Sequence, residues 1–187
     1  MVLSTCASLQ WVPGDASELM HTLVFMSPAD HFVDARIYKN QYPHIQEDFE
    51  DIFDWVIVGE KVPLSDSRIR FTHAVDLREI MTALKTNRPL LECRSGPDIG
   101  EFSPVEGSAN RRETGTMVHP ATGVPTEYVE IWRLLDPIRT TFETEVAEGD
   151  AWDATVCTAT YRYSEGKRQG RVIVLGNWVQ GVIYDSL

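Results

Sequence analysis

Short runs rich in valine, isoleucine, threonine and aromatic residues recur along this chain, each bounded by a polar connector or one containing glycine or proline. Such runs predict β-strands, because β-branched and aromatic side chains pack well on a pleated sheet. The predicted strands are residues 21–26, 31–38, 54–60, 68–76, 89–95, 115–120, 127–135, 152–163 and 170–185. Short connectors at 27–30 and 164–170 indicate hairpin turns, so the strands that they join are expected to pair antiparallel.

Two segments show helical patterns instead. The first is residues 45–53. The second is residues 76–85, where Asp76 stands as an N-cap before apolar residues at helical spacing: Leu77, Ile80, Met81 and Leu84. We expect residues 94–113, which are polar and rich in glycine, serine and proline, to form a loop. With no repeat and no linker, the chain is expected to be one domain over residues 1–187.

About nine strands and at most two short helices predict an all-β, mainly antiparallel fold, and both a sandwich and a closed barrel fit this count. One strand favours the barrel. It places Tyr128, Glu130 and Trp132 on one face and Val129 and Ile131 on the other, so neither face is plainly a solvated one. A sheet closed around a cavity accounts for both faces, because its interior can be aromatic with isolated polar groups.

Similar mixed faces recur on three other predicted strands: Phe32 with Asp34 and Arg36, Phe71 with His73 and Val75, and Trp178 with Gln180, Val182 and Tyr184. Each sets polar groups among aromatic or aliphatic neighbours, as the lining of a small-molecule cavity would. A partly solvated outer face gives the same alternation, so for any single strand both interpretations stay open.

The net charge and the cysteines limit which partners and which cellular compartment are expected for this protein. The formal net charge of −11 would repel phosphate backbones and anionic membranes, so neither nucleic acid nor a membrane is an expected partner. The three cysteines are far apart and odd in number, which indicates reduced thiols. With no signal peptide visible, we expect a cytoplasmic protein.

Several of these runs resemble a fungal family of lipocalin-like β-barrel proteins, over residues 27–39, 53–61, 71–79, 113–137 and 170–185. The family includes a yeast protein that binds a casein-kinase-I-type kinase. Close relatives include hetero-Diels–Alderases of tropolonic sesquiterpenoid biosynthesis, a branch of fungal secondary metabolism. The resemblance therefore implies a lipocalin-like β-barrel and either cyclisation chemistry or partner binding.

One departure from this family concerns the end of the chain. Relatives continue for further strands after the segment 170–185, whereas this chain stops at Leu187. An exposed apolar strand templates pairing with another chain. We therefore expect either a homodimer that uses this edge or a barrel that closes on it.

Standard catalytic motifs are absent, and the five histidines show no ligand spacing, so neither a metal site nor a cofactor is expected. We assign candidate catalytic roles to His73, Glu130 and Arg36. The candidate substrate-binding residues are Asp34, Phe71, Tyr128, Trp132, Trp178 and Gln180.

Each assignment has a structural alternative. His73 is either an acid or base in an apolar cavity or a histidine that only bonds a neighbouring strand. Arg36 either holds an anionic or enolised oxygen or forms a surface ion pair with Asp34. The aromatic residues either shape a pocket for a flat unsaturated ligand or are plain core. If strand 68–76 presents its other face, Asp76 replaces His73 as the candidate acid.

Two functions follow from these assignments. The first is a small cofactor-independent cyclase or dehydratase-cyclase acting on an apolar or polyene-type substrate. Such reactions gain chiefly from a near-attack pose and one or two hydrogen bonds, so no motif is required. The alternative is a non-catalytic barrel that engages a kinase or carries a small apolar ligand unchanged.

Overall fold

The computed structural model describes residues 1–41, 48–147 and 156–185 of the chain. Eight of its strands close into an antiparallel β-barrel, which confirms the predicted fold class. In order around the barrel these are β1 (Val2–Trp11), β2 (Met20–Met26), β3 (His31–Tyr38), β4 (Phe53–Pro63), β5 (Arg68–Phe71), β7 (Asp98–Pro104), β8 (Arg111–Val118) and β9 (Pro125–Leu134). Pairing of β9 with β1 and of β3 with β4 completes the circle.

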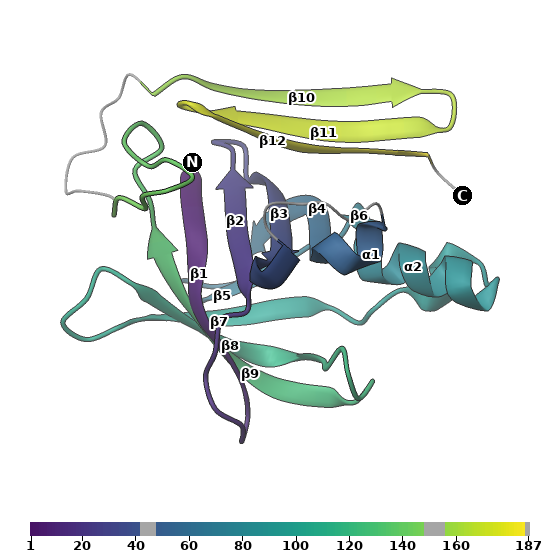
Figure 1. Ribbon diagram of the computed structural model, residues 1–187, viewed down its shortest axis with the longest axis horizontal. Helices are drawn as coiled ribbons and strands as arrows, with labels where there is room; N and C mark the ends of the chain where they lie inside the picture. The colour runs from purple at the N-terminus through teal and green to yellow at the C-terminus, as the bar shows by residue number, and fades with distance from the viewer. Residues whose placement is uncertain (42–47, 148–155, 186–187) are drawn as a thin grey trace.

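A second antiparallel sheet lies outside the barrel and consists of β10 (Thr158–Glu165), β11 (Arg168–Leu175) and β12 (Trp178–Asp185). Figure 1 shows it as a separate layer across the barrel. The core between the two layers combines residues from β1–β4, from the position just after β9 and from the second sheet: Leu3, Phe25, Val33, Val58, Leu135, Ile173, Leu175 and Trp178. Because strand side chains alternate, the opposite faces of β1–β4 remain to line the barrel interior.

Helix α2 (Leu77–Thr86) lies beside the barrel, as Figure 1 shows, and confirms the helix predicted at 76–85. The Asp76 side chain caps it by accepting hydrogen bonds from the backbone N–H groups of Arg78 and Glu79. Asp76 itself belongs to the short strand β6 (Val75–Asp76), which pairs with β4. The remaining helical segments are α1 (Phe49–Ile52) and the 3-10 turns η1 (Lys39–Gln41) and η2 (Leu90–Cys93). No helix in the described ranges is long and apolar enough to cross a membrane.

Two predicted elements are wrong. The strand predicted at 89–95 is the 3-10 turn η2, in which Leu91 is 78% exposed, so its short apolar run has no sheet to pack on. The loop predicted at 94–113 contains β7 and the start of β8, which are joined by a hairpin. Pairing with β5 and β9 holds this glycine- and serine-rich segment extended despite its composition.

Other boundaries also differ from the prediction. Strand β1 was not predicted, because it is rich in small residues, yet its pairing with β2 and β9 is needed to close the barrel. The run predicted at 170–185 is two strands, β11 and β12, that turn at Gly176, whose φ of 59° favours glycine. Parts of the elements predicted at 45–53 and 152–163 lie outside the described residues, as does Leu187.

Candidate functional site

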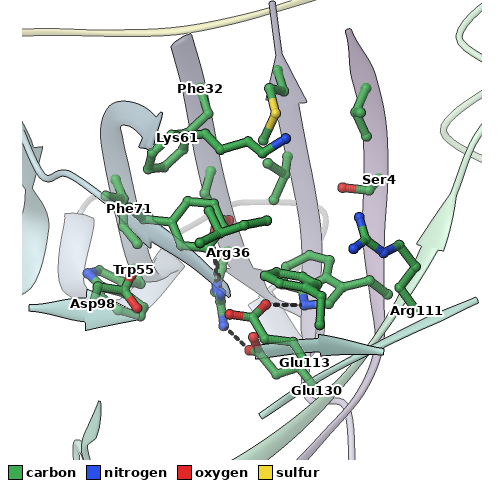
Figure 2. Close-up of a pocket in the computed structure, with 18 of the residues that line it drawn as sticks. Ser4, Phe32, Arg36, Trp55, Lys61, Phe71, Asp98, Arg111, Glu113 and Glu130 are labelled. Carbon is green, nitrogen blue, oxygen red and sulfur yellow. Dashed lines mark hydrogen bonds and ion pairs between the residues drawn. The ribbon is translucent and has the colours of Figure 1, made fainter. Parts of the chain in front are cut away.

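The barrel encloses a cavity of about 130 Å³. The structure brings six of the residues proposed from the sequence to its lining: Asp34, Arg36, Phe71, Tyr128, Glu130 and Trp132. Figure 2 shows side chains from several strands converging on this space, with Arg36 near its centre. An engineered cavity of about 150 Å³ binds benzene, so the enclosed part accommodates roughly one six-membered ring.

Arg36 organises the polar part of the cavity. Its Nε and Nη2 donate to Asp34 Oδ2 at 3.1 and 3.0 Å, and its Nη1 donates to Glu130 Oε1 at 2.7 Å. The guanidinium also lies 5.3 Å from the ring centroid of Trp55 and 5.7 Å from that of Trp132. Burial opposes its charge, but the two carboxylates outweigh this effect and hold the pKa of Arg36 well above its ordinary value.

A further buried carboxyl group, Glu113 on β8, lies directly opposite Glu130 on β9. The Tyr128 hydroxyl donates to Glu113 Oε1 at 3.0 Å, and Trp132 Nε1 donates to Oε2 at 2.8 Å. Burial raises the pKa of Glu113 to about 8, and the negative charges of Glu130 and Asp98 act in the same direction. Glu113 is therefore mostly protonated at neutral pH, as a general acid must be.

Two glycines, one on β7 and one on β8 itself, make room for Glu113 and for its partner Tyr128. A Cβ at Gly100 on β7 would overlap Glu113 Oε1, and a Cβ at Gly115 on β8 would lie 2.7 Å from the Tyr128 hydroxyl. Sequence reasoning missed Glu113 because it lay in the predicted loop 94–113. Its alternation with Gly115 and Met117 is the signal that would have extended the strand predicted at 115–120 back to it.

The two carboxylates that contact Arg36 are also perturbed. Burial raises the pKa of Asp34 and of Glu130, and the neighbouring Arg36 opposes the increase in both. Asp34 Oδ1 is buried and has no hydrogen-bond partner in the described part of the chain. This oxygen is thus available to accept a hydrogen bond from a ligand or a buried water molecule.

His73 lies outside the cavity lining, because β5 ends at Phe71 and the alternation of faces does not continue through residues 72–74. Its Nδ1 pairs with Asp76 Oδ2 at 2.8 Å and its Nε2 with Asp98 Oδ2 at 3.0 Å. Burial lowers the pKa of His73, but these two carboxylates outweigh it and raise the pKa to about 9. The ring is therefore a charged donor between two acids at neutral pH.

Trp178 and Gln180 also lie away from the cavity. Trp178 packs against Phe25 in the core between the two layers, with ring centroids 6.5 Å apart. Gln180 Nε2 donates to the backbone carbonyls of Leu23 and Val33, each at 2.9 Å. Both residues face the outer wall of the barrel, because β12 belongs to the second sheet and not to the barrel.

A larger groove of about 790 Å³ lies beside α2 and the segment 93–98, and His73 belongs to its lining. It shares Trp55, Asp98 and Met117 with the cavity, so these three residues separate an inner from an outer compartment. A substrate larger than one ring would have to extend beyond the enclosed cavity.

Among the described residues, His73, Asp76 and Glu79 form one group that could hold a metal, with ligand atoms within 4.8 Å of one another. Other contacts already explain these positions. His73 bonds two carboxylates, Asp76 caps α2, and Glu79 Oε1 accepts from the backbone N–H of Ser95 at 2.6 Å. The predictions that no metal and no cofactor is needed stay predictions.

Comparisons with known proteins agree with the barrel. The sequence model of the family described as "Protein HRI1" matches residues 2–186. The crystal structure of the uncharacterized protein YLR301w from Saccharomyces cerevisiae is similar in fold, with a TM-score of 0.70 and 18% sequence identity. This likeness covers 98% of the present chain and 74% of the yeast chain. A search of curated proteins gave no match.

Proposed function

Since this chain belongs to the HRI1 family and its barrel encloses a buried acid, we propose that it is a cofactor-independent dehydratase-cyclase. Its substrate would be a small, apolar, unsaturated alcohol bound in the cavity. The observation that carries the proposal is Glu113, a carboxyl group with a pKa of about 8 that lines this cavity. An acid of this kind donates a proton at neutral pH without a metal or a cofactor.

In the proposed reaction, Glu113 transfers its proton to the substrate hydroxyl, the carbon–oxygen bond breaks and water leaves. The faces of Trp55 and Trp132 and the carboxylate of Glu130 stabilise the positive charge that develops on carbon. Glu113 then removes a proton from the adjacent carbon, so the net change is the loss of one water and the acid is restored. Tyr128 and Trp132 stabilise the intermediate carboxylate through the hydrogen bonds described above.

The unsaturated product can cyclise in the same space. A cavity that holds the reacting ends close together lowers the entropic cost of a pericyclic step. This step is the cyclisation that the resemblance to hetero-Diels–Alderases implies, and we extend it to this chain as part of the proposal. Because the enclosed space is about 130 Å³, a sesquiterpenoid partner would occupy the outer groove as well.

The test is turnover of a panel of unsaturated terpenoid and polyketide alcohols, with product detection as the loss of one water by mass spectrometry. Glu113→Gln retains the size of the side chain and an acceptor for Trp132, but it cannot donate the proton. We expect a fall in rate of about 10²-fold or more. Glu127→Gln, the same substitution at an exposed position on β9, should retain full activity.

The second candidate function is binding without chemistry, either of a small ligand or of a protein partner such as a kinase. It is favoured by the fact that both oxygens of Glu113 already accept hydrogen bonds, which gives the residue a structural role. Calorimetric binding of panel members that are never converted, with equal affinity for wild type and Glu113→Gln, would support this candidate and refute catalysis.

A further inference from the structure

Charged residues are segregated along the cavity. Of its four carboxyl groups, Asp34 and Glu130 bond Arg36, Glu113 lies opposite Glu130, and Asp98 lies on the side of the outer groove. The two remaining cations of the lining, Lys61 and Arg111, lie elsewhere on it. Along β8, Arg111 is the first residue and Glu113 comes two positions later on the same face, so the positive group lies toward the strand end and the acid lies deeper.

The two cations lie where the lining of the cavity reaches solvent, because the Lys61 side chain is 28% exposed and Arg111 is exposed as well. Figure 2 shows Lys61 and Arg111 on opposite walls, with the Ser4 side chain next to Arg111. Arg111 is exposed, and its guanidinium lies 4.8 Å from the ring centroid of Phe102. In the described ranges Arg111 forms no ion pair. Lys61 forms a long one, with its Nζ 3.9 Å from Asp30 Oδ1. Neither positive charge is closely neutralised, although the chain carries a net charge of −11.

The interior, in contrast, repels an anion. Arg36 already donates to Asp34 and Glu130, and Asp34 Oδ1 is buried without a partner. An anionic group placed there would be desolvated beside carboxylates, which is costly. The polarity of the cavity therefore orients any charged ligand with its negative end at the opening.

We propose that the ligand of this cavity is an apolar organic acid, whose single negative charge lies between Lys61 and Arg111. Its body extends inward along the aromatic wall formed by Phe32, Phe71 and Phe102. Any hydroxyl group at the inner end meets Asp34 and Glu113. The inference rests on the proposed function only in assigning both to the same cavity, and it deepens that function by naming the substrate class.

The test uses three probes with one phenylbutyl body and different head groups: phenylbutyrate, phenylbutanol and phenylbutylamine. Their affinities for the whole protein are measured by isothermal titration calorimetry at neutral pH, first at low and then at high salt. We expect the anion to bind tightest, the alcohol next and the amine weakest. The advantage of the anion should shrink as salt rises.

Substitutions of the two cations test whether they contact the negative charge of the ligand. Lys61→Gln and Arg111→Gln should each weaken phenylbutyrate by about three- to fivefold and leave phenylbutanol unchanged, as expected for a partly exposed charge pair. Arg112→Gln is the matched control, because it removes the same charge from the next, exposed position on β8, whose side chain points to the other face. It should leave all three affinities unchanged.

The inference is overturned if the amine binds tightest, if the three probes bind equally, or if none of them binds. It is also overturned if Arg112→Gln has the same effect as Arg111→Gln, since the charge would then act at long range. Turnover is not needed for any of these measurements. If the protein turns over the panel substrates but does not prefer the anionic probe, this inference alone is refuted. If it prefers the anionic probe but turns over no substrate, the proposed function alone is refuted.

Discussion

Glu113 and Glu130 occupy directly opposed positions on β8 and β9, and both side chains are buried inside the barrel. Like charges opposed in this way destabilise a sheet. Of the two glutamates, only Glu130 contacts Arg36. The pair is therefore most stable when Glu130 is ionised and Glu113 holds a proton. The arrangement is the acid–base asymmetry that a proton-transfer site requires.

Rising pH should destabilise the protein through Glu113. The folded protein keeps this proton up to a pH of about 8, whereas an ordinary glutamate releases it near 4.5. Between these values the folded state binds more protons than the unfolded state, so the free energy of unfolding falls as pH rises, by roughly 3–5 kcal/mol over the window. Denaturant unfolding of wild type and Glu113→Gln from pH 4 to 9 should show this loss in wild type and a flatter profile in the variant. Equal slopes would contradict the assignment.

Replacement of Trp132 by Phe should raise the pKa of Glu113 further. The change removes the Nε1 donor that stabilises the carboxylate and retains much of the ring. The pH at which the loss of stability levels off should therefore move upward. Trp11→Phe serves as a comparison, because Trp11 stacks near Tyr128 but has no described bond to Glu113. A downward move for Trp132→Phe would mean that the indole does not stabilise the ionised form.

Arg36→Met should be strongly destabilising. The side chain is similar in length, but its loss leaves Asp34 and Glu130 buried without their cation, which costs about 3–5 kcal/mol. Adding Asp34→Asn and Glu130→Gln should restore part of the stability, because the uncompensated charges disappear. Chemical denaturation of the single and triple variants measures this coupling. Additive losses would show that the ion pairs are not coupled.

His73→Ala should lower stability by about 2–3 kcal/mol near pH 6, because Asp76 and Asp98 lose a charged donor. The pKa of His73 is raised, so its contribution is complete below its ordinary value of 6.5 and disappears as pH rises through about 9. Thermal unfolding of both proteins should therefore show a gap at pH 6 that narrows toward pH 10. A gap independent of pH would instead indicate lost packing.

We also propose that two copies associate through the outer face of the second sheet. Tyr161, Val179 and Ile183 are each at least 60% exposed on this face. Residues 158–185 contain four basic and two acidic side chains, so two copies repel one another less through this sheet than the net charge of −11 alone implies. Light scattering should show a dimer for wild type and a monomer for Val179→Lys with Ile183→Lys. A wild-type monomer would refute the proposal.

Much of the cavity lining could be predicted because the alternation of strand faces is a local property. Asp34 and Arg36 are two residues apart, as are Tyr128 and Glu130, so each pair had to share a face once its strand was identified. Their convergence on one space then depended only on barrel closure. The missed Glu113 shows the limit of composition, because Gly100, one of the glycines that make its segment look like a loop, is also the residue that makes room for its carboxyl group.

His73 lines the outer groove and Trp178 lies in the core between the layers, away from the inner cavity, because contacts distant in the sequence decide what each strand face packs against. Trp178 does share a face with Gln180, but that face belongs to the sheet outside the barrel. The alternation through His73 ends with β5, where the chain leaves the barrel toward β6 and α2. The sequence next to Trp178 does not indicate that β12 lies outside the barrel, and the sequence next to His73 does not indicate that β5 ends before it.

The wall formed by β1–β4 has a consequence for how this protein can diverge. Val33 holds the two layers together, while Phe32 and Asp34, its immediate neighbours in the chain, face the cavity. Substitutions at alternate positions can therefore change nearly independently, because one set packs the core and the other set shapes the cavity. A lineage with this architecture can change the shape and polarity of its cavity without changing the core that keeps it folded.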